Sequence, residues 1–221
     1  MNHYFSADYH LSHKNICKYC NRPFNSKEEM NEAIISNHNS LVKPNDIFYF
    51  LGDLCFGNEQ TIAQFLRRLN GNIKVVFGNH DKTLRKFAKK DLNAHSDLRD
   101  RIEFLGDYKE IEINNQHIVL SHYAFRVFNR SHKGAWNLYG HSHGNLPDDP
   151  HTLGIDVGID CHNYFPINFD QISKIMSKKL WQPIDHHGKD LEGGGVGLNK
   201  EDYAKLDRKR QYEQLRKEFE T

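Results

Sequence analysis

The 221-residue chain has no run approaching the roughly 20 apolar residues that a membrane-spanning helix needs. Its first residues lack the charged and apolar regions of a signal peptide, and four cysteines are too few for a disulfide scaffold. Thirty basic against 29 acidic residues leave a net charge of +1, so neither a polybasic nucleic-acid clamp nor an acidic tail dominates. These absences predict a cytoplasmic protein in a reducing compartment.

The sequence predicts one large domain at residues 1–182, long enough to bury its own core. Residues 183–199 contain Gly193–Gly195 and are expected to form a glycine-rich linker. Residues 200–221 are expected to form a charged helix or tail with nearly balanced charge, and contact with a partner or nucleic acid is the alternative there. No heptad pattern indicates an oligomeric state.

The first half of the domain alternates between strand and helix patterns. Strands are expected at 3–7, 46–51 and 73–77, and helices at 27–42 and 58–70. The helix at 27–42 is preceded by Ser26, and Glu29 completes a capping box. This alternation predicts an α/β sheet with crossover helices.

The second half has shorter strand patterns separated by turns. They lie at 101–105, 110–113, 117–121, 136–139 and 153–157, followed by a helix at about 169–179. Asn114-Asn115 fits a hairpin turn between two of these strands. We therefore expect a second, more antiparallel set of strands.

Many of the expected strands are followed at once by a polar cluster. The carboxyl ends of strands in an open α/β sheet converge on one edge, where binding sites form. Five clusters placed in this way predict a shared pocket. They are Asp8-Tyr9-His10, Gly52-Asp53, Gly78-Asn79-His80-Asp81, Ser121-His122 and Gly140-His141-Ser142-His143.

The side chains in these clusters are suited to binding metal ions. Residues i and i+2 of an extended segment point to one face, so each Asp-x-His or His-x-His pair is expected to aim two ligands together. Mixed carboxylate, amide and imidazole donors favour Mn, Fe, Zn or Co over Mg or Ca. So many ligands exceed what one ion takes, which predicts two ions sharing a carboxylate. The candidates are Asp8, His10, Asp53, Asn79, His122, His141 and His143.

In order, Asp-x-His, Gly-Asp, Gly-Asn-His-Asp, His and Gly-His-x-His over residues 8–143 resemble the motif set of the calcineurin-like metallophosphoesterases. The chain is similar to a small bacterial or phage member of that superfamily. Val157–Asp160 and Asn163–Pro166 also resemble a segment common in small members. The resemblance implies an α/β fold of two packed mixed β-sheets flanked by helices, an αββα sandwich.

The resemblance also implies a role for each motif residue. Asp53 would bridge the two ions, while His80 would be the general acid, oriented by Asp81. The first ion would be bound by Asp8, His10, Asp53 and His143, and the second by Asp53, Asn79, His122 and His141.

Two ions held in this way suit the hydrolysis of phosphate esters. Their charge exceeds that of Asp8 and Asp53, so a hydroxide and a phosphate oxyanion are favoured in one pocket. The ions lower the pKa of a shared water and clamp the nonbridging oxygens, and His80 would protonate the departing alkoxide. We expect Mn²⁺, with Fe, Zn or Ni as alternatives, because the ligand types do not decide among them.

The expected substrate is a small phosphodiester, a nucleotide or cyclic nucleotide, on grounds of analogy and size. Protein phosphatases of this superfamily carry arginines beside the second and third motifs, whereas here Leu54 follows Asp53 and Phe77 precedes Gly78. The alternatives are a phosphomonoesterase, a nuclease acting on DNA or RNA ends, and a non-catalytic metal-binding scaffold.

Three further residues near the motifs are candidate substrate contacts: His13, Tyr123 and Arg126. For His13 a local structural hydrogen bond is the alternative. Cys17-x-x-Cys20 has no second cysteine pair elsewhere, so ordinary thiols are favoured over a zinc knuckle.

Overall fold

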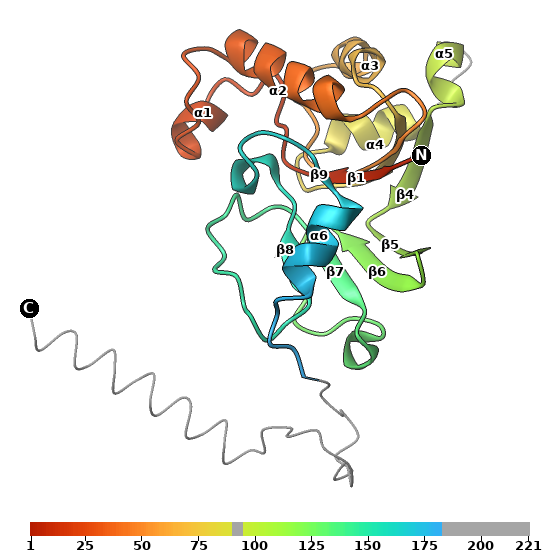
Figure 1. Cartoon of the computed structure of the whole chain (residues 1–221). Coiled ribbons are helices and arrows are strands. Elements are labelled where there is room, and N and C mark those ends of the chain that lie inside the picture. Colours follow the sequence, from red (N-terminus) through yellow and green to blue (C-terminus); the bar gives the residue numbers. More distant parts are fainter. Residues whose placement is uncertain (90–94, 183–221) are drawn as a thin grey trace, which may run out of the picture. The chain divides into compact units, whose positions relative to one another are not determined.

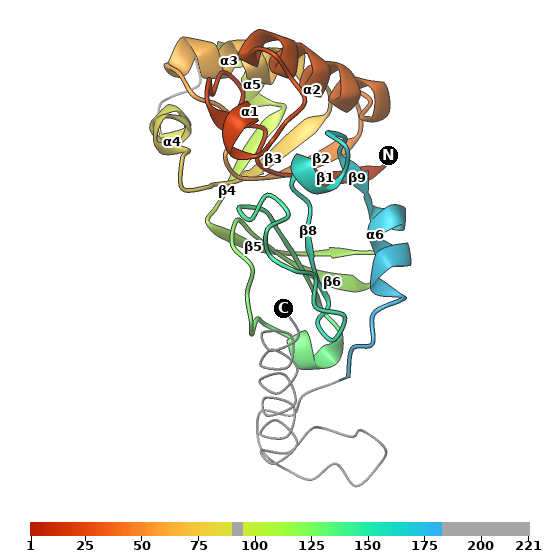
Figure 2. The same ribbon diagram turned by 90° about the vertical axis from the view of Figure 1, so that its left-hand side faces the viewer.

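The computed structural model describes residues 1–89 and 95–182. Met1–Trp181 form one compact unit, in which two mixed β-sheets pack together with helices (Figures 1 and 2). This is the architecture that the sequence predicts. The expected linker at 183–199 and the charged tail at 200–221 lie outside the described residues.

The first sheet has the strand order β4-β3-β2-β1-β9. Its strands β1 to β4 are parallel, and β9 pairs with β1 in the antiparallel direction. The strands are β1 (His3–Ser6), β2 (Ile47–Leu51), β3 (Asn72–Val76), β4 (Ile102–Gly106) and β9 (Ile167–Asn168). The segment at 101–105 was expected to belong to the second set of strands, and this expectation is wrong. β4 belongs to the first sheet, since Ile102 pairs with Ile73 of β3.

The second sheet has the order β5-β6-β7-β8. It comprises β5 (Tyr108–Ile113), β6 (Gln116–Ser121), β7 (Trp136–Tyr139) and β8 (Gly154–Asp156). Asn114 and Asn115, with φ of 51° and 65°, form the expected turn between β5 and β6. The expectation of a more antiparallel sheet is wrong beyond this hairpin: β6, β7 and β8 are parallel, because long connections return the chain to the same end.

Helices cover the outer face of the first sheet, and one helix packs against the core between the two sheets. Figures 1 and 2 show α2 (Lys27–Leu41) and α3 (Glu59–Arg68) over the face of the first sheet that is turned away from the second sheet. Within residues 1–89 and 95–182 the other α-helices are α1 (Ile16–Tyr19), α4 (Lys82–Ala88), α5 (Ser96–Arg99) and α6 (Phe169–Met176). The N-cap of α2 is as expected, because the Ser26 hydroxyl accepts from the N–H of Glu29 at 3.1 Å. The Glu29 carboxylate instead accepts from the N–H of Asn25, at 2.8 Å.

The alternating side chains of β1, β2 and β3 fill two separate cores. On β2, Phe48 and Phe50 face the helices, whereas Tyr49 and Leu51 face the second sheet. Phe48 and Phe50 are fully buried, and burying one such side chain contributes roughly 1.5–3 kcal/mol. A first sheet packed on both faces holds the ends of its strands in fixed positions.

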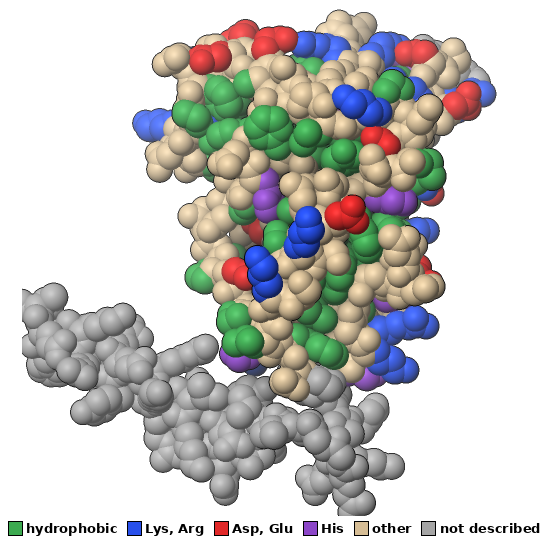
Figure 3. All heavy atoms as spheres, in the orientation of Figure 1, with side chains coloured by type: hydrophobic (Ala, Val, Ile, Leu, Met, Phe, Trp, Pro, Cys, Tyr) green, Lys and Arg blue, Asp and Glu red, His purple; other side chains and the backbone are tan. Residues whose placement is uncertain are grey.

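The surface carries charges of both signs. On the face drawn in Figure 3, acidic and basic side chains are interspersed over the described part of the chain. Within residues 1–89 and 95–182, no helix has the length and apolar character needed to cross a membrane.

Candidate metal centre

The carboxyl ends of five strands meet where the two sheets adjoin. Because β1, β2 and β3 are parallel, the loops after them emerge at the same edge of the first sheet. The loops are tied together: the N–H of Asp8 donates to the carbonyl of Gly52 at 2.9 Å, and the N–H of His10 donates to that of Asp53 at 3.0 Å. The loop after β7 reaches the same place, because the N–H of His141 donates to Oδ2 of Asp8 at 2.8 Å. The loop after β6 joins it, because the N–H of Gly140 donates to the carbonyl of His122 at 3.1 Å.

Five of the seven candidate ligands have a left-handed backbone. The φ angles are 60° at Asp8, 49° at His10, 63° at Asp53, 70° at His141 and 48° at His143. Such conformations cost about 1–3 kcal/mol each outside glycine and gather at functional sites. The ligand pairs are therefore not in the extended conformation that the sequence predicts. Asp8 and His10 still face one another as expected, with Oδ1 of Asp8 3.9 Å from Nε2 of His10. His141 and His143 do not point together: the His143 ring lies 5.1 Å from that of His10, and the His141 ring 5.1 Å from that of His122.

Glycines directly precede three of the seven candidate ligands, Asp53, Asn79 and His141, because there is no room for a side chain at these positions. A Cβ atom on Gly78 would lie 2.1 Å from Oδ1 of Asp53. One on Gly140 would lie 2.6 Å from Oδ2 of Asp8, and one on Gly52 2.5 Å from Nδ1 of His122. The glycines of the sequence motifs thus allow the candidate ligands to approach closely.

Asp53 lies at the middle of the cluster. Its Oδ2 is 3.6 Å from Nε2 of His10 on one side and 3.5 Å from Nε2 of His122 on the other. Its Oδ1 accepts a hydrogen bond from the backbone N–H of His80 at 2.8 Å. Burial alone would raise the pKa of Asp53, but His122, His10 and this N–H lower it below its usual value. Asp53 is therefore an ionised carboxylate placed between two histidines.

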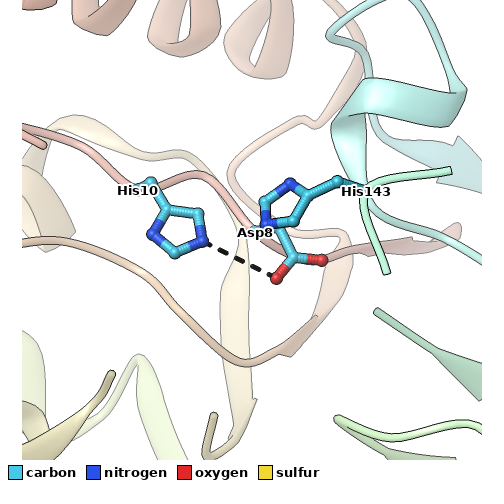
Figure 4. Close-up of side chains that lie close together, drawn as sticks. All are labelled: Asp8, His10 and His143. Atoms are coloured by element: carbon cyan, nitrogen blue, oxygen red, sulfur yellow. Dashed lines mark ion pairs between the residues drawn. The ribbon is translucent and has the colours of Figure 1, made fainter. Parts of the chain in front are cut away.

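On one side of Asp53, Asp8, His10 and His143 converge (Figure 4). One ligand atom from each lies within 4.8 Å of the others, and Nε2 of His10 is 3.9 Å from Oδ1 of Asp8. Among the described residues, Oδ1 of Asp8 and both ring nitrogens of His10 are buried without a hydrogen-bond partner. Burial raises the pKa of Asp8 to about 7 and lowers that of His10 to about 3. Buried lone pairs that face one another in this way fit a cation.

His143 is oriented by a buried ion pair. Its Nδ1 donates to Oδ2 of Asp160 at 2.7 Å, and Asp160 is bonded at both oxygens by the Arg22 guanidinium, at 2.8 and 2.7 Å. Burial alone would lower the pKa of His143, but the hydrogen bond with Asp160 raises it to about 10. Arg22 also donates to the carbonyls of Asp8 at 2.7 Å and Tyr9 at 3.0 Å. One guanidinium therefore fixes both the first ligand turn and the ring of His143.

On the other side of Asp53, His122 faces Asn79. Nδ1 of His122 lies 2.8 Å from the carbonyl oxygen of Leu51, which can only accept, so Nδ1 carries a proton. Nε2 then lies 2.9 Å from Oδ1 of Asn79, and atoms of Asp8, Asp53 and His122 form a second group within 4.8 Å. Burial would lower the pKa of His122, but the neighbouring carboxylates raise it. His141 packs beside this group.

His80 and Asp81 do not form the expected pair. The His80 ring is exposed and lies 5.6 Å from that of His10. Within the described residues Asp81 makes no hydrogen bond to His80. Its carboxylate is buried and accepts from the backbone N–H groups of Asp53, Gly78 and Leu54 at 2.8, 2.8 and 3.0 Å. Because three N–H donors occupy both oxygens, Asp81 positions the loops after β2 and β3 in place of orienting the imidazole.

The three candidate substrate contacts lie in different settings. His13 stacks on Phe56, with ring centroids 4.1 Å apart, and its ring is 5.6 Å from that of His10. Tyr123 is exposed and lies 4.6 Å from the His141 ring. Arg126 is exposed and, in the part of the chain that the structure describes, makes no hydrogen bond or ion pair with the cluster.

Cys17 and Cys20 face different neighbours. The Cys17 thiol donates to the sulfur of Met30 at 3.6 Å. The Cys20 sulfur lies within 4.8 Å of a ligand atom of His143 and one of Asp160. All four cysteines of the chain carry free thiols. Cys17 therefore contacts the core, as an ordinary thiol does, and Cys20 borders the candidate centre.

Arg22 and Asp160 are functional residues that the sequence does not predict. Asp160 lies in the Val157–Asp160 segment that resembles small family members, and this resemblance is the one feature that could have indicated it. No sequence feature indicates Arg22, because the two residues are 138 positions apart and meet only through the fold.

Comparison with known proteins shows the family of this chain. Residues 1–153 match the calcineurin-like phosphoesterase superfamily domain. The chain is 35% identical over 182 residues to the uncharacterized protein MJ1445 of Methanocaldococcus jannaschii, covering 79% of this chain and 91% of that protein. The crystal structure of AQ665 from Aquifex aeolicus, a protein of unknown function, superposes with a TM-score of 0.57 at 23% identity, covering 79% of this chain and 98% of that one.

The chain belongs to the calcineurin-like phosphoesterase superfamily. It is a hydrolase of phosphate esters, and the family depends on divalent metal ions. The residues of this phosphoesterase fit such ions, since the unpartnered Oδ1 of Asp8 and Nε2 of His10 are buried and lie beside the Asp53 carboxylate.

Proposed function

We propose that this phosphoesterase hydrolyses small phosphodiesters, nucleotides or cyclic nucleotides, with two divalent transition-metal ions. The observation that carries the proposal is the position of Asp53, whose Oδ2 lies 3.6 Å from His10 and 3.5 Å from His122. A carboxylate flanked by two histidine groups is the arrangement that two ions sharing one ligand require.

Each side of Asp53 supplies the remaining ligands. Asp8, His10 and His143 would hold the first ion, and Asn79, His122 and His141 the second. When bound, the ions would supply positive charge to the phosphate oxygens and lower the pKa of a water molecule, so that hydroxide is available to attack phosphorus. We favour Mn²⁺, with Fe, Zn or Ni as alternatives, because the mixed nitrogen and oxygen donors suit several transition metals.

The protein itself would contribute orientation and proton transfer. Asp160 keeps the Nδ1 proton on His143, and the Leu51 carbonyl keeps the Nδ1 proton on His122, so both Nε2 atoms face inward. The exposed imidazole of His80 is free to approach a departing alkoxide and give it a proton. Its backbone N–H donates to Asp53, which holds the main chain of His80 beside the centre.

The surroundings of the cluster support a diester over a monoester. His80, His13 and Phe56 lie on the side of His10, with the His80 and Phe56 ring centroids 5.4 Å apart. A separate cavity adjoins His122 on the other side of Asp53. A phosphate at the centre could place one organic group in this cavity and a second along the exposed ring of His80, and a diester has two such groups.

Metal-reconstituted full-length protein tests this proposal. We expect Mn²⁺-dependent hydrolysis of bis-4-nitrophenyl phosphate to exceed that of 4-nitrophenyl phosphate. Asp53→Asn should abolish turnover and reduce the bound metal, measured by elemental analysis, below one ion per chain, because both sites lose their shared charge. Asp97→Asn is the matched control, since Asp97 is exposed and pairs with Arg67.

The outcomes separate the alternatives. Faster turnover of the monoester would instead indicate a phosphomonoesterase, and a preference for DNA or RNA ends a nuclease. Full metal binding without any turnover would favour the scaffold. A cytoplasmic location remains a prediction.

A further inference from the structure

A cavity of about 190 Å³ opens beside the second half of the cluster. Asn79 and His122 line it, together with Phe77, Arg85, Asp107 and Tyr123. Asn79 and His122 are candidate ligands, so a group in the cavity would be continuous with a phosphate bound at the centre. The other four residues have no role in the metal site.

The wall of this cavity includes flat groups that stack on one another. The Phe77 and Phe104 rings are 5.7 Å apart and nearly parallel, with an interplanar angle of 6°. The Arg85 guanidinium carbon lies 4.6 Å above the centre of the Phe77 ring. Asp107 forms an ion pair with the same guanidinium. The Arg85 side chain is still 38% exposed, so it is accessible to a ligand.

The charge of the cavity indicates what it would bind. The sequence has no arginine beside the second and third motifs, and Arg85 brings one over Phe77 from helix α4. Because Asp107 neutralises Arg85, the pair offers hydrogen-bond donors and acceptors without net charge. It therefore suits a neutral polar group better than a second phosphate.

The size of the cavity narrows the ligand further. Sites for drug-sized ligands measure roughly 300–1,000 Å³, so this smaller space holds a single ring system. The exposed ring of Tyr123 and the stacked guanidinium offer flat surfaces on which a heterocycle can stack. The cavity lies on the His122 side of Asp53, whereas His80, the proposed proton donor, lies on the His10 side.

We propose that this cavity binds the nucleoside that stays on the phosphate when a diester is cleaved. The departing alcohol would lie on the His80 side, and the retained heterocycle would stack between Tyr123 and the Arg85–Phe77 pair. This inference rests on the proposed phosphodiesterase function and specifies its substrate as a nucleoside ester.

Two diesters with the same leaving group test the proposal. Thymidine 5′-(4-nitrophenyl phosphate) and methyl 4-nitrophenyl phosphate both release 4-nitrophenol and differ only in the retained group. We expect kcat/KM for the thymidine ester to exceed that for the methyl ester by about tenfold, the magnitude of one base stacking on a flat side chain. Arg85→Met and Phe77→Ala should bring this ratio close to one. Lys86→Ala, an exposed cation one position along α4, is the matched control and should keep the ratio.

The result can be separated from a failure of the proposed function. If neither ester is hydrolysed, the phosphodiesterase proposal fails, and calorimetric binding of thymidine 5′-monophosphate against methyl phosphate then tests the cavity alone. Tighter binding of the nucleotide that Arg85→Met removes supports the proposal. A wild-type ratio near one in both measurements, or a ratio that Arg85→Met leaves intact, overturns it; this variant replaces a partly exposed side chain and should fold.

Discussion

Asp160 accepts a hydrogen bond from Nδ1 of His143 at 2.7 Å, and the Arg22 guanidinium holds both oxygens of the same carboxylate. Both members of the ion pair are nearly excluded from solvent, with side chains 0% and 7% exposed for Arg22 and Asp160. The bond fixes the tautomer of His143, so that its Nε2 is the atom available to a metal ion. A charge pair in the interior thus positions a ligand at the centre.

Asp160→Ala is therefore expected to weaken metal binding and folding together. Loss of such an outer partner typically costs 10–100-fold in metal affinity. The buried Arg22 would lose its counter-charge, and breaking one side of such a pair costs about 3–5 kcal/mol. Titration calorimetry with Mn²⁺ and urea unfolding measure the two effects, with Asp170→Ala on the exposed face of α6 as the control. Unchanged affinity in a destabilised variant would show that Asp160 serves folding alone.

Gly52, which precedes Asp53, and Gly106 both have a positive φ, so replacing each with alanine separates steric clash from backbone strain. Gly52 has φ of +97° and would place a Cβ atom 2.5 Å from Nδ1 of His122, whereas Gly106 has φ of +89° and nothing within 4 Å. Both alanine variants carry backbone strain, but only Gly52→Ala adds a steric clash. We expect Gly106→Ala to lose about 1 kcal/mol of unfolding free energy, and Gly52→Ala to lose several times more. Equal losses in urea unfolding would argue against close approach as the reason for glycine here.

Much of the candidate site could be predicted because the arrangement of strands determines it. Parallel strands bring their carboxyl ends to one edge, so clusters at positions 8, 53 and 79 had to lie close together once the strands were identified. The pairing of β4 with β3 could not be predicted from the sequence in the same way. Its pattern resembles that of β5, and only the crossover through α4 and α5 decides which sheet it joins.

Other features depend on contacts that the local sequence does not record. The left-handed turns at Asp8 and His143 are uncommon outside glycine and depend on the fold around them. Arg22 donates to the carbonyl of Asp8, and Asp160 fixes the ring of His143. Asp81 appears beside His80 in the sequence, yet its carboxylate turns inward to three backbone N–H groups. Sequence adjacency indicated the cluster correctly but not the direction of this side chain.

The burial of His38, outside the candidate site, predicts that the free energy of unfolding falls in acid. The Tyr9 hydroxyl donates to its Nδ1 at 2.9 Å, and its Nε2 donates to the carbonyl of Asn70 at 3.0 Å, so the folded protein holds a neutral ring. Burial lowers the pKa of His38 to about 4. Because the unfolded chain, with a pKa of about 6.5, binds the proton more readily, stability should be complete above pH 6.5 and fall as the pH drops toward 4.

Protonation of His38 should lower the free energy of unfolding by roughly 3 kcal/mol at most, from the difference between the pKa values of the folded and unfolded chain. Urea unfolding of the wild type and of His38→Gln, at intervals from pH 7 to pH 4, isolates it from other titrating groups. The variant should lose less stability over this range. Parallel curves for the two proteins would contradict the assignment.

His80 and Asp81 are adjacent, and the structure predicts opposite consequences for their replacement. If His80 protonates the leaving group, His80→Ala should slow an alkyl diester by about a hundredfold or more and change a 4-nitrophenyl diester far less, because 4-nitrophenolate departs without a proton. Asp81→Asn should instead lower the unfolding free energy, since one amide oxygen cannot replace a carboxylate that accepts from Asp53, Gly78 and Leu54. Its effect on turnover should be the same for both esters. A loss that depends on the leaving group in Asp81→Asn would mean that Asp81 does orient His80 during the reaction, and equal slowing of both esters in His80→Ala would remove His80 from proton transfer.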